Sequence, residues 1–134
     1  MQTCPRMLMP PISRYMTPAP HAVAPNDTVL AARAVMGQYR IHHLPVVAEQ
    51  ALVGIVSDRD LHGASDDSVA DAMSRQVASV ATLAPLDEVV ALMEAQRIGS
   101  VVVVGAAGVE GIFTLTDALR AFGDMLRRME RGER

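Results

Sequence analysis

One short pattern with the residue types of a ligand site occurs twice in this chain. Its first copy is Gly-Ile-Val-Ser-Asp-Arg-Asp at residues 54–60, and its second is Gly-Ile-Phe-Thr-Leu-Thr-Asp at residues 111–117. In each copy a hydroxyl residue stands where an apolar strand should end and a helix should begin. The free N–H groups of a helix start favour an anion such as phosphate. An acid three residues later could accept hydrogen bonds from both hydroxyls of a ribose.

The same spacing also fits a helix cap. Ser57 and Thr114 are suitable N-cap residues, and each is followed three residues later by an aspartate, Asp60 or Asp117. Duplication of a cap would produce two copies as readily as duplication of a binding site. The residues alone therefore leave both interpretations open.

The surrounding elements are duplicated as well. A shift of 57 residues aligns segment 12–61 with segment 69–118 without a gap, and twelve of the fifty positions are identical. The pairs Met16/Met73, Arg40/Arg97 and Gly54/Gly111 are among them. We therefore expect an α/β (α+β) fold with two similar halves, related by a pseudo-twofold axis and closed on their apolar faces.

Each half is predicted to contain the same elements in the same order. The first long helix of each half should begin near Thr28, as N-cap, and near Pro85, as first helical residue. A final helix should begin at Ser57 and at Thr114. The other elements are helical turns at 12–16 and 69–73, extended pieces at 22–24 and 79–81, and strand pairs at 44–47 with 52–56 and at 101–104 with 109–113.

The organisation of the chain follows from these elements. The predicted segments are a flexible N-terminal arm (1–11), a first repeat (12–62), a linker (63–68), a second repeat (69–126) and a charged C-terminal tail (127–134). The last helix carries an apolar stripe that fits either the core or a surface for a partner helix. The stripe consists of Leu119, Phe122, Leu126 and Met129.

Composition excludes several classes of protein. The chain has 134 residues, half of them hydrophobic, and a net charge of −3, so a packed aliphatic core is attainable. All basic residues are arginine, which excludes lysine chemistry of the P-loop or Schiff-base kind. The mild acidity and the few aromatic residues argue against nucleic-acid binding. No apolar run is long enough to cross a bilayer and no signal peptide is evident, so we expect a soluble, cytoplasmic protein.

No catalytic or metal site is predicted. The single cysteine, Cys4, cannot form an internal disulfide or a cysteine zinc cluster. His42 and His43 are adjacent, and adjacent residues of an extended segment point to opposite faces, so they do not form an obvious chelate. No group of nucleophile, base and acid stands out.

The ordered set of features resembles the cystathionine β-synthase (CBS) domain. The features are the paired helix–strand pattern, the segment Arg-Ile-His-His-Leu-Pro-Val-Val at 40–47, and Gly-Ile-Val-Ser-x-x-Asp, and the resemblance covers roughly residues 10–125. Two copies resemble a tandem CBS pair, or Bateman module. This resemblance implies two β-α-β-β-α repeats that form a disc-like homodimer.

The resemblance also implies a regulatory function without catalysis. Such a module would bind an adenosyl ligand in the cleft between its repeats: AMP, ADP or ATP, with S-adenosylmethionine and NAD(H) as further candidates. No cofactor is required, no nucleic acid or membrane is bound, and an unknown partner protein would be regulated in trans. The alternative is a structural dimerisation or interaction module without a functional ligand site.

Two sites follow from the same resemblance, in which the acid holds ribose, the hydroxyl and nearby basic residues meet phosphate, and the opposite repeat supports adenine. The second site, which contains Asp117, has Thr116 and Gly99 where the first site, which contains Asp60, has Arg59 and His42. We therefore expect the second site to lack positive charge and the first site to prefer phosphorylated ligands. The first site comprises His42, Ser57, Arg59, Asp60, Ser74, Val77 and Ser79, and the second Thr17, Pro20, Ala22, Thr114, Thr116 and Asp117.

Overall fold

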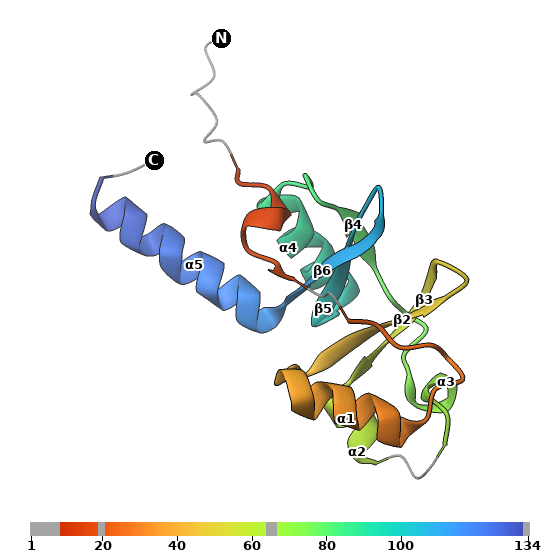
Figure 1. Cartoon of the computed structure of the whole chain (residues 1–134). Coiled ribbons are helices and arrows are strands. Elements are labelled where there is room, and N and C mark those ends of the chain that lie inside the picture. The colour runs from red at the N-terminus through yellow and green to blue at the C-terminus, as the bar shows by residue number, and fades with distance from the viewer. Residues whose placement is uncertain (1–8, 19–20, 64–66, 133–134) are drawn as a thin grey trace.

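The computed structural model describes residues 9–18, 21–63 and 67–132, which form two halves (Figure 1). One half holds the strands β2 and β3 with the helices α1, α2 and α3, and the other holds β4, β5 and β6 with α4 and α5. The elements are η1 (Ile12–Arg14), β1 (Thr17–Pro18), α1 (Val29–Tyr39), β2 (His43–Ala48), β3 (Ala51–Ser57), α2 (Asp58–His62), α3 (Val69–Ala72), β4 (Ser79–Ala81), α4 (Leu86–Gln96), β5 (Ser100–Gly105), β6 (Gly108–Thr114) and α5 (Leu115–Glu130).

The two halves repeat each other in register. The hairpin β2–β3 pairs His43 with Ser57, and the hairpin β5–β6 pairs Ser100 with Thr114, which are the same positions shifted by 57. Both hairpins carry a register irregularity at the equivalent place, after Val46 and after Val103. The predicted α/β fold with two similar halves is therefore confirmed.

The long helices α1 and α4 are also equivalent. The Thr28 side chain accepts a hydrogen bond from the N–H of Ala31, as its predicted role as N-cap requires. Pro85, predicted as the first helical residue, is instead the N-cap of α4, so the helix begins one residue later than predicted, at Leu86. Both helices are followed by an arginine as C-cap, Arg40 or Arg97, whose φ of 54° places it in the left-handed region. The chain therefore turns identically into β2 and β5.

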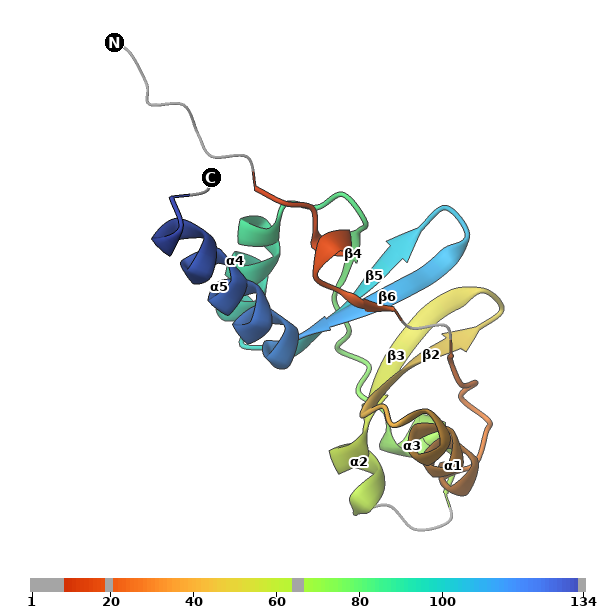
Figure 2. The same ribbon diagram turned by 60° about the vertical axis from the view of Figure 1, so that its left-hand side comes forward.

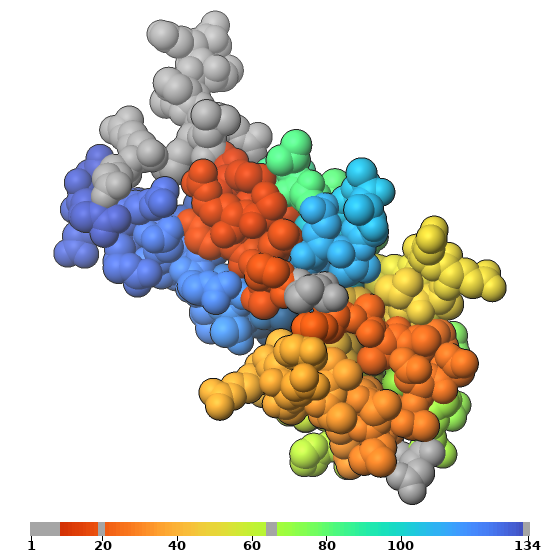
Figure 3. All heavy atoms as spheres, in the orientation of Figure 1, coloured from red at the N-terminus to blue at the C-terminus, as the bar shows by residue number. Residues whose placement is uncertain are grey.

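Two segments, which we call the crossing segments (residues 10–18 and 67–75), lie against the half that does not follow them in sequence. In the first, the N–H of Ile12 donates to the carbonyl of Ala84 at 2.8 Å, and Ile12 lies in the core around α4. In the second, the N–H of Val69 donates to the backbone carbonyl of Asp27 at 2.8 Å, and Val69 lies in the core around α1. Figure 3 shows the first crossing segment, in red, seated on the second half of the molecule.

Each crossing segment continues across a glycine of the opposite half. Thr17 and Pro18 of β1 pair antiparallel with Ile112 and Gly111 of β6. At the equivalent place in the other half, the N–H of Ser74 donates to the carbonyl of Ile55 at 2.8 Å, beside Gly54. A methyl group at residue 111 would lie 2.9 Å from the carbonyl oxygen of Thr17. The two glycines of the repeated motif therefore admit backbone, since a side chain there would separate the halves.

A third group of buried residues closes the contact between the halves. Ile55, Ile112 and Val102 form this cluster, with Val77 packed against it. Its members come from both hairpins, which lie side by side between the helices in Figure 2. The predicted closure on apolar faces is therefore present at this contact.

The ends of the described chain differ from the predicted segments. The carbonyl of Pro10, within the predicted arm, accepts a hydrogen bond from the N–H of Leu86 at 3.0 Å. The predicted tail begins at residue 127, but α5 continues to Glu130 because Leu126 and Met129 extend its helical pattern. The stripe of Leu119, Phe122, Leu126 and Met129 lies on the surface of α5, with each side chain 47–71% exposed. Among the described residues, no helix is long and apolar enough to cross a membrane.

Replacement of Gly111 by alanine should destabilise the protein by about 1–3 kcal/mol, because the new methyl group meets the backbone of the first crossing segment. Gly37 on α1 is the matched control, since nothing lies within 4 Å of a methyl group there. Gly37→Ala should raise the stability by about 0.5–1 kcal/mol through the helix preference of alanine. Urea unfolding of both variants measures the difference. Equal free energies of unfolding for the two would contradict this account of the crossing.

Candidate ligand pocket between the two halves

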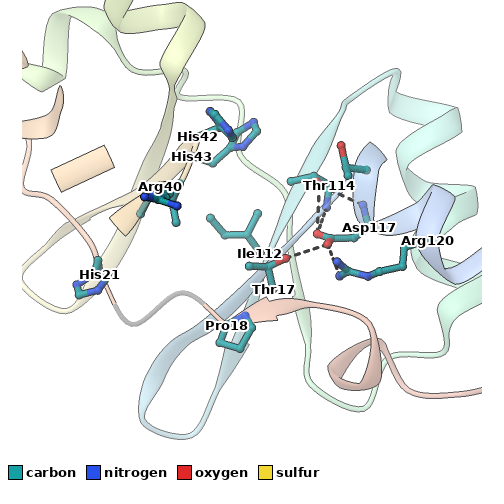
Figure 4. A pocket seen from close by; sticks show the side chains of 12 residues that line it. Thr17, Pro18, His21, Arg40, His42, His43, Ile112, Thr114, Asp117 and Arg120 are labelled. Carbon is teal, nitrogen blue, oxygen red and sulfur yellow. Dashed lines mark hydrogen bonds and ion pairs between the residues drawn. The ribbon is translucent and has the colours of Figure 1, made fainter. Parts of the chain in front are cut away.

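A pocket of about 420 Å³ lies between the halves. One wall comes from the approach to β2, residues 40–43, and the other from the start of α5 and the first crossing segment (Figure 4). The size is within the range of small-molecule sites. Its lining residues are Thr17, Pro18, His21, Arg40, Ile41, His42, His43, Ile112, Thr114, Thr116, Asp117 and Arg120.

Asp117 is the buried charge of this pocket, with only 3% of its surface exposed. Its Oδ1 accepts hydrogen bonds from the Thr17 hydroxyl at 2.8 Å and from the Arg120 guanidinium at 2.6 Å. Its Oδ2 accepts from the N–H of Thr114 at 2.9 Å and from the hydroxyl of Thr114 at 3.1 Å. The carboxylate is thus paired as a buried charge must be, and it draws its donors from both the helix start and the crossing segment.

Arg120 connects Asp117 with the first crossing segment. Its guanidinium also donates to the backbone carbonyl of Tyr15 at 3.2 Å. One helical turn further along α5, Asp124 Oδ2 accepts from the Tyr15 hydroxyl at 2.5 Å. That hydrogen bond lowers the pKa of Asp124, while burial and the same contact raise the pKa of Tyr15. The start of α5 is therefore fixed to residue 15 at two successive turns.

The pocket carries several cationic or ionisable groups. Arg40 faces it from the end of α1, and Arg120 faces it from α5, as Figure 4 shows. His21, His42 and His43 complete this set. The expectation that the Asp117 site lacks positive charge is therefore wrong. That expectation rested only on the positions equivalent to Arg59 and His42. The arginines of the pocket lie elsewhere, with Arg40 at the end of α1 and Arg120 one helical turn beyond the motif.

His43 is half-buried at the centre of the molecule. Burial, and next the neighbouring His42, lower its pKa from the usual 6.5, while the carboxylates of Asp60, Asp117 and Asp58 act in the opposite direction. His43 pairs with Ser57 of the first motif and lines the pocket with Asp117 of the second, so it lies between the two copies of the motif. The lowering effects prevail, and the lowered pKa of His43 favours a neutral imidazole near pH 7.

The first copy of the motif forms a complete capping box. Asp60 N–H donates to the Ser57 hydroxyl at 3.1 Å, and the Ser57 N–H donates back to Asp60 Oδ2 at 2.8 Å. The second copy, Thr114 with Asp117, forms the same box. The capping interpretation is thus confirmed for both copies, and the second also lines the pocket.

The remaining residues of the predicted first site are spread around α2 and the second crossing segment. Arg59 and Ser74 are exposed, Val77 packs in the cluster between the halves, and Ser79 begins β4. His42, which we assigned to that site, has its Nδ1 atom 3.5 Å from Asp58 Oδ2 but lines the Asp117 pocket.

The predicted second site is gathered more closely. Thr17, Thr114, Thr116 and Asp117 all line the pocket. Ala22 instead borders a separate hollow beside the hairpin turns. Pro20 lies outside the described residues. Among those residues, no group of three or more His, Cys, Asp or Glu side chains could hold a metal ion.

Sequence reasoning missed the arginines of the pocket. Arg40 belongs to the identical pair Arg40/Arg97, and that identity was a usable signal. Arg120 has Gly63 at the equivalent position of the first repeat, so the comparison of repeats could not reveal it. Its spacing of three residues from Asp117, which places both on one helix face, was the available signal.

The chain matches the family model described as "CBS domain" twice, at residues 12–67 and 69–124. It is 32% identical over 104 residues to inosine-5'-monophosphate dehydrogenase of Staphylococcus saprophyticus, a match that covers 73% of this chain but only 21% of that enzyme. The chain thus spans about a fifth of the length of the curated relatives it matches.

Two solved structures share this architecture. The CBS domain pair of protein MJ0100, in complex with 5'-methylthioadenosine and S-adenosyl-L-methionine, has a TM-score of 0.76 and 28% identity, with 87% of this chain and 98% of that chain covered. CBSX2, in complex with AMP, has a TM-score of 0.70 and 25% identity, with 86% and 97% covered.

The lowered pKa of His43 predicts a loss of stability in mild acid. The unfolded chain binds a proton at this residue near pH 6.5, whereas the folded chain resists protonation until a lower pH. Stability attributable to His43 is therefore complete above about pH 6.5 and falls as the pH decreases towards the folded pKa. His43→Gln should reduce this loss when urea unfolding is compared at about pH 7.5 and pH 5.5. An identical pH dependence in the exposed control His62→Gln and in His43→Gln would contradict it.

Proposed function

The chain belongs to the CBS domain family and carries two CBS domains in tandem, and from this we propose that it is a regulatory module that binds an adenosyl nucleotide of the AMP, ADP or ATP class between its repeats. The module has no catalytic function and requires no cofactor. It acts in the cytoplasm on a partner protein in trans.

One observation carries the proposal: a buried carboxylate, Asp117, opens onto a pocket between the halves that two arginines also line. A carboxylate suits the hydroxyls of a ribose, and arginine suits phosphate through its paired donors. The related pairs described above were solved with AMP, 5'-methylthioadenosine and S-adenosyl-L-methionine. An adenosine unit is the part that these three ligands share.

The walls of the pocket explain how binding would be transmitted. Arg40 and His43 belong to the first half, whereas Thr114 and Asp117 belong to the second. A ligand that contacts both walls binds one relative placement of the halves better than another, and this difference in affinity shifts the population. The partner protein would bind differently to the surface that the ligand-bound placement of the two halves presents.

The first motif supplies a second position for such a ligand. Asp60 Oδ2 is used by the capping box, and among the described residues no hydrogen-bond donor reaches Oδ1. Arg59, which is exposed on α2, provides positive charge beside Asp60. The proposed contact residues are Ser57, Arg59, Asp60, Ser74, Val77 and Ser79, with His42 shared with the Asp117 pocket.

A homodimer through α5 is part of the proposal. The exposed stripe of α5 runs beside an apolar hollow of about 350 Å³, lined by residues of α4 and α5 that include Val90, Met93 and Leu115. A twofold interface uses the same patch on both subunits, so a patch with both projecting and hollow parts can pair with itself. If no ligand binds, this surface supports the alternative function of a structural dimerisation module.

AMP should stabilise the natural protein against thermal unfolding by about 2.7 kcal/mol at a hundredfold excess over Kd, because it binds only the folded state. Asp117→Asn should remove most of the ligand-dependent shift, and Asp60→Asn should remove the contribution of the first position. Asp71→Asn, an exposed acid on α3 outside the pocket, should retain the full shift. If both motif variants keep the natural response to AMP, the two aspartates only cap their helices and the proposal fails.

Phe122→Ser should convert the dimer to a monomer, because this side chain is 61% exposed at the centre of the stripe. Sedimentation velocity measures the change. Leu83→Ser is the matched control, since Leu83 is 77% exposed but lies between β4 and α4. A monomeric natural protein, or equal sedimentation of both variants, would contradict the interface.

A further inference from the structure

The Asp117 carboxylate has no acceptor position left for a ligand. A carboxylate offers about four positions to hydrogen-bond donors. Two are used on Oδ1 by Thr17 and Arg120, and two on Oδ2 by the N–H and the hydroxyl of Thr114. A ribose that binds this carboxylate must therefore displace a donor already present.

The donors differ in how readily they can leave. The Thr114 contacts belong to the capping box, and their loss would uncap α5. Thr17 is held by the pairing of β1 with β6. The Arg120 side chain also donates to the Tyr15 carbonyl at 3.2 Å, but Tyr15 stays bound to α5 through Asp124 when this contact is lost. The Arg120 side chain is 57% exposed, at the end of a long flexible stem, and can turn towards the pocket that it lines. Arg120 is thus the donor that a ligand displaces at least structural cost.

Displacement of Arg120 has an electrostatic cost that depends on the ligand. Its 2.6 Å contact with Asp117 is a charge-assisted hydrogen bond to a buried acid. A neutral nucleoside would break this contact and offer the guanidinium no anion in return. A ligand with a phosphate group would replace the carboxylate with another anion within reach of the same side chain. The exchange then retains a charge-assisted contact for Arg120.

We propose that Arg120 makes the Asp117 pocket selective for phosphorylated over uncharged adenosyl ligands, by occupying the carboxylate until a phosphate replaces it. The inference rests on the proposed function and adds the ligand class for this pocket. This role of an arginine is specific to the second half, because the residue equivalent to Arg120 in the first half is Gly63.

The experiment compares AMP with adenosine by isothermal titration calorimetry. The full chain carries Asp60→Asn in all variants, so that the first motif does not contribute. The measured quantity is the ratio of the Kd for adenosine to the Kd for AMP. With Arg120 present, the ratio should exceed about ten, and Arg120→Met should lower it about tenfold or more, because one charge-assisted hydrogen bond is at stake.

Three variants make the result specific. Arg120→Lys keeps the positive charge and should keep most of the preference for AMP. Arg128→Met removes an arginine from the same helix, 3.4 Å from Asp124 and outside the pocket, and should leave the ratio unchanged. Thr17→Val frees one acceptor position on Oδ1, so adenosine can bind without displacing Arg120, and the ratio should fall in this variant as well. Thermal unfolding without ligand sets a temperature at which every variant is folded.

The possible failures are distinguishable. An unchanged ratio in Arg120→Met, with AMP still bound by the natural chain, overturns the role of Arg120 and leaves the proposed function intact. A change of ratio in Thr17→Val but not in Arg120→Met also overturns it, because the displaced donor would then be the threonine. Absence of binding for both AMP and adenosine in the natural chain overturns the proposed function itself.

Discussion

Close approach of backbone to backbone at two glycines holds the molecule together. At Gly54 and Gly111, each half accepts a crossing segment of the other, and a methyl group at either position would meet a carbonyl oxygen within 3 Å. The position of the first crossing segment brings Thr17 to Asp117, and that of the second brings Ser74 beside Ile55. The pocket therefore exists because of this crossing, and its floor is made of residues that are far apart in sequence.

Asp117 shows how one residue can serve structure and site together. Its bonds to Thr114 cap α5, and its bond to Thr17 connects α5 with the first crossing segment. Its partner Arg120 makes a second such connection, to the Tyr15 carbonyl. The two interpretations of the repeated motif are therefore compatible. A helix start is a natural place for a binding carboxylate, because the cap fixes the orientation that a ligand would require.

Sequence reasoning could predict what is local or duplicated. The strands, the Thr28 cap and the two capping boxes depend on short patterns, and the shift of 57 residues doubled each signal. It could not predict where Ile12 packs, because the apolar surfaces of two similar halves suit the same side chain. Arg120 was missed for the opposite reason, since its counterpart Gly63 breaks the repeat. The assignment of His42 to the first site did not anticipate its place in the Asp117 pocket, because the approach to β2 faces the start of α5 only in the folded molecule.

The crossing segments also determine how this protein can be dissected. A fragment cut at the boundary between repeats would lack Val69, which fills the core around α1, and would keep Ile12 without the α4 core that buries it. The second fragment would lack Ile12, which fills the core around α4, and would keep Val69 without the α1 core that buries it. Each sequence repeat is therefore only part of a folding unit, and the smallest autonomous piece of this architecture is the undivided pair.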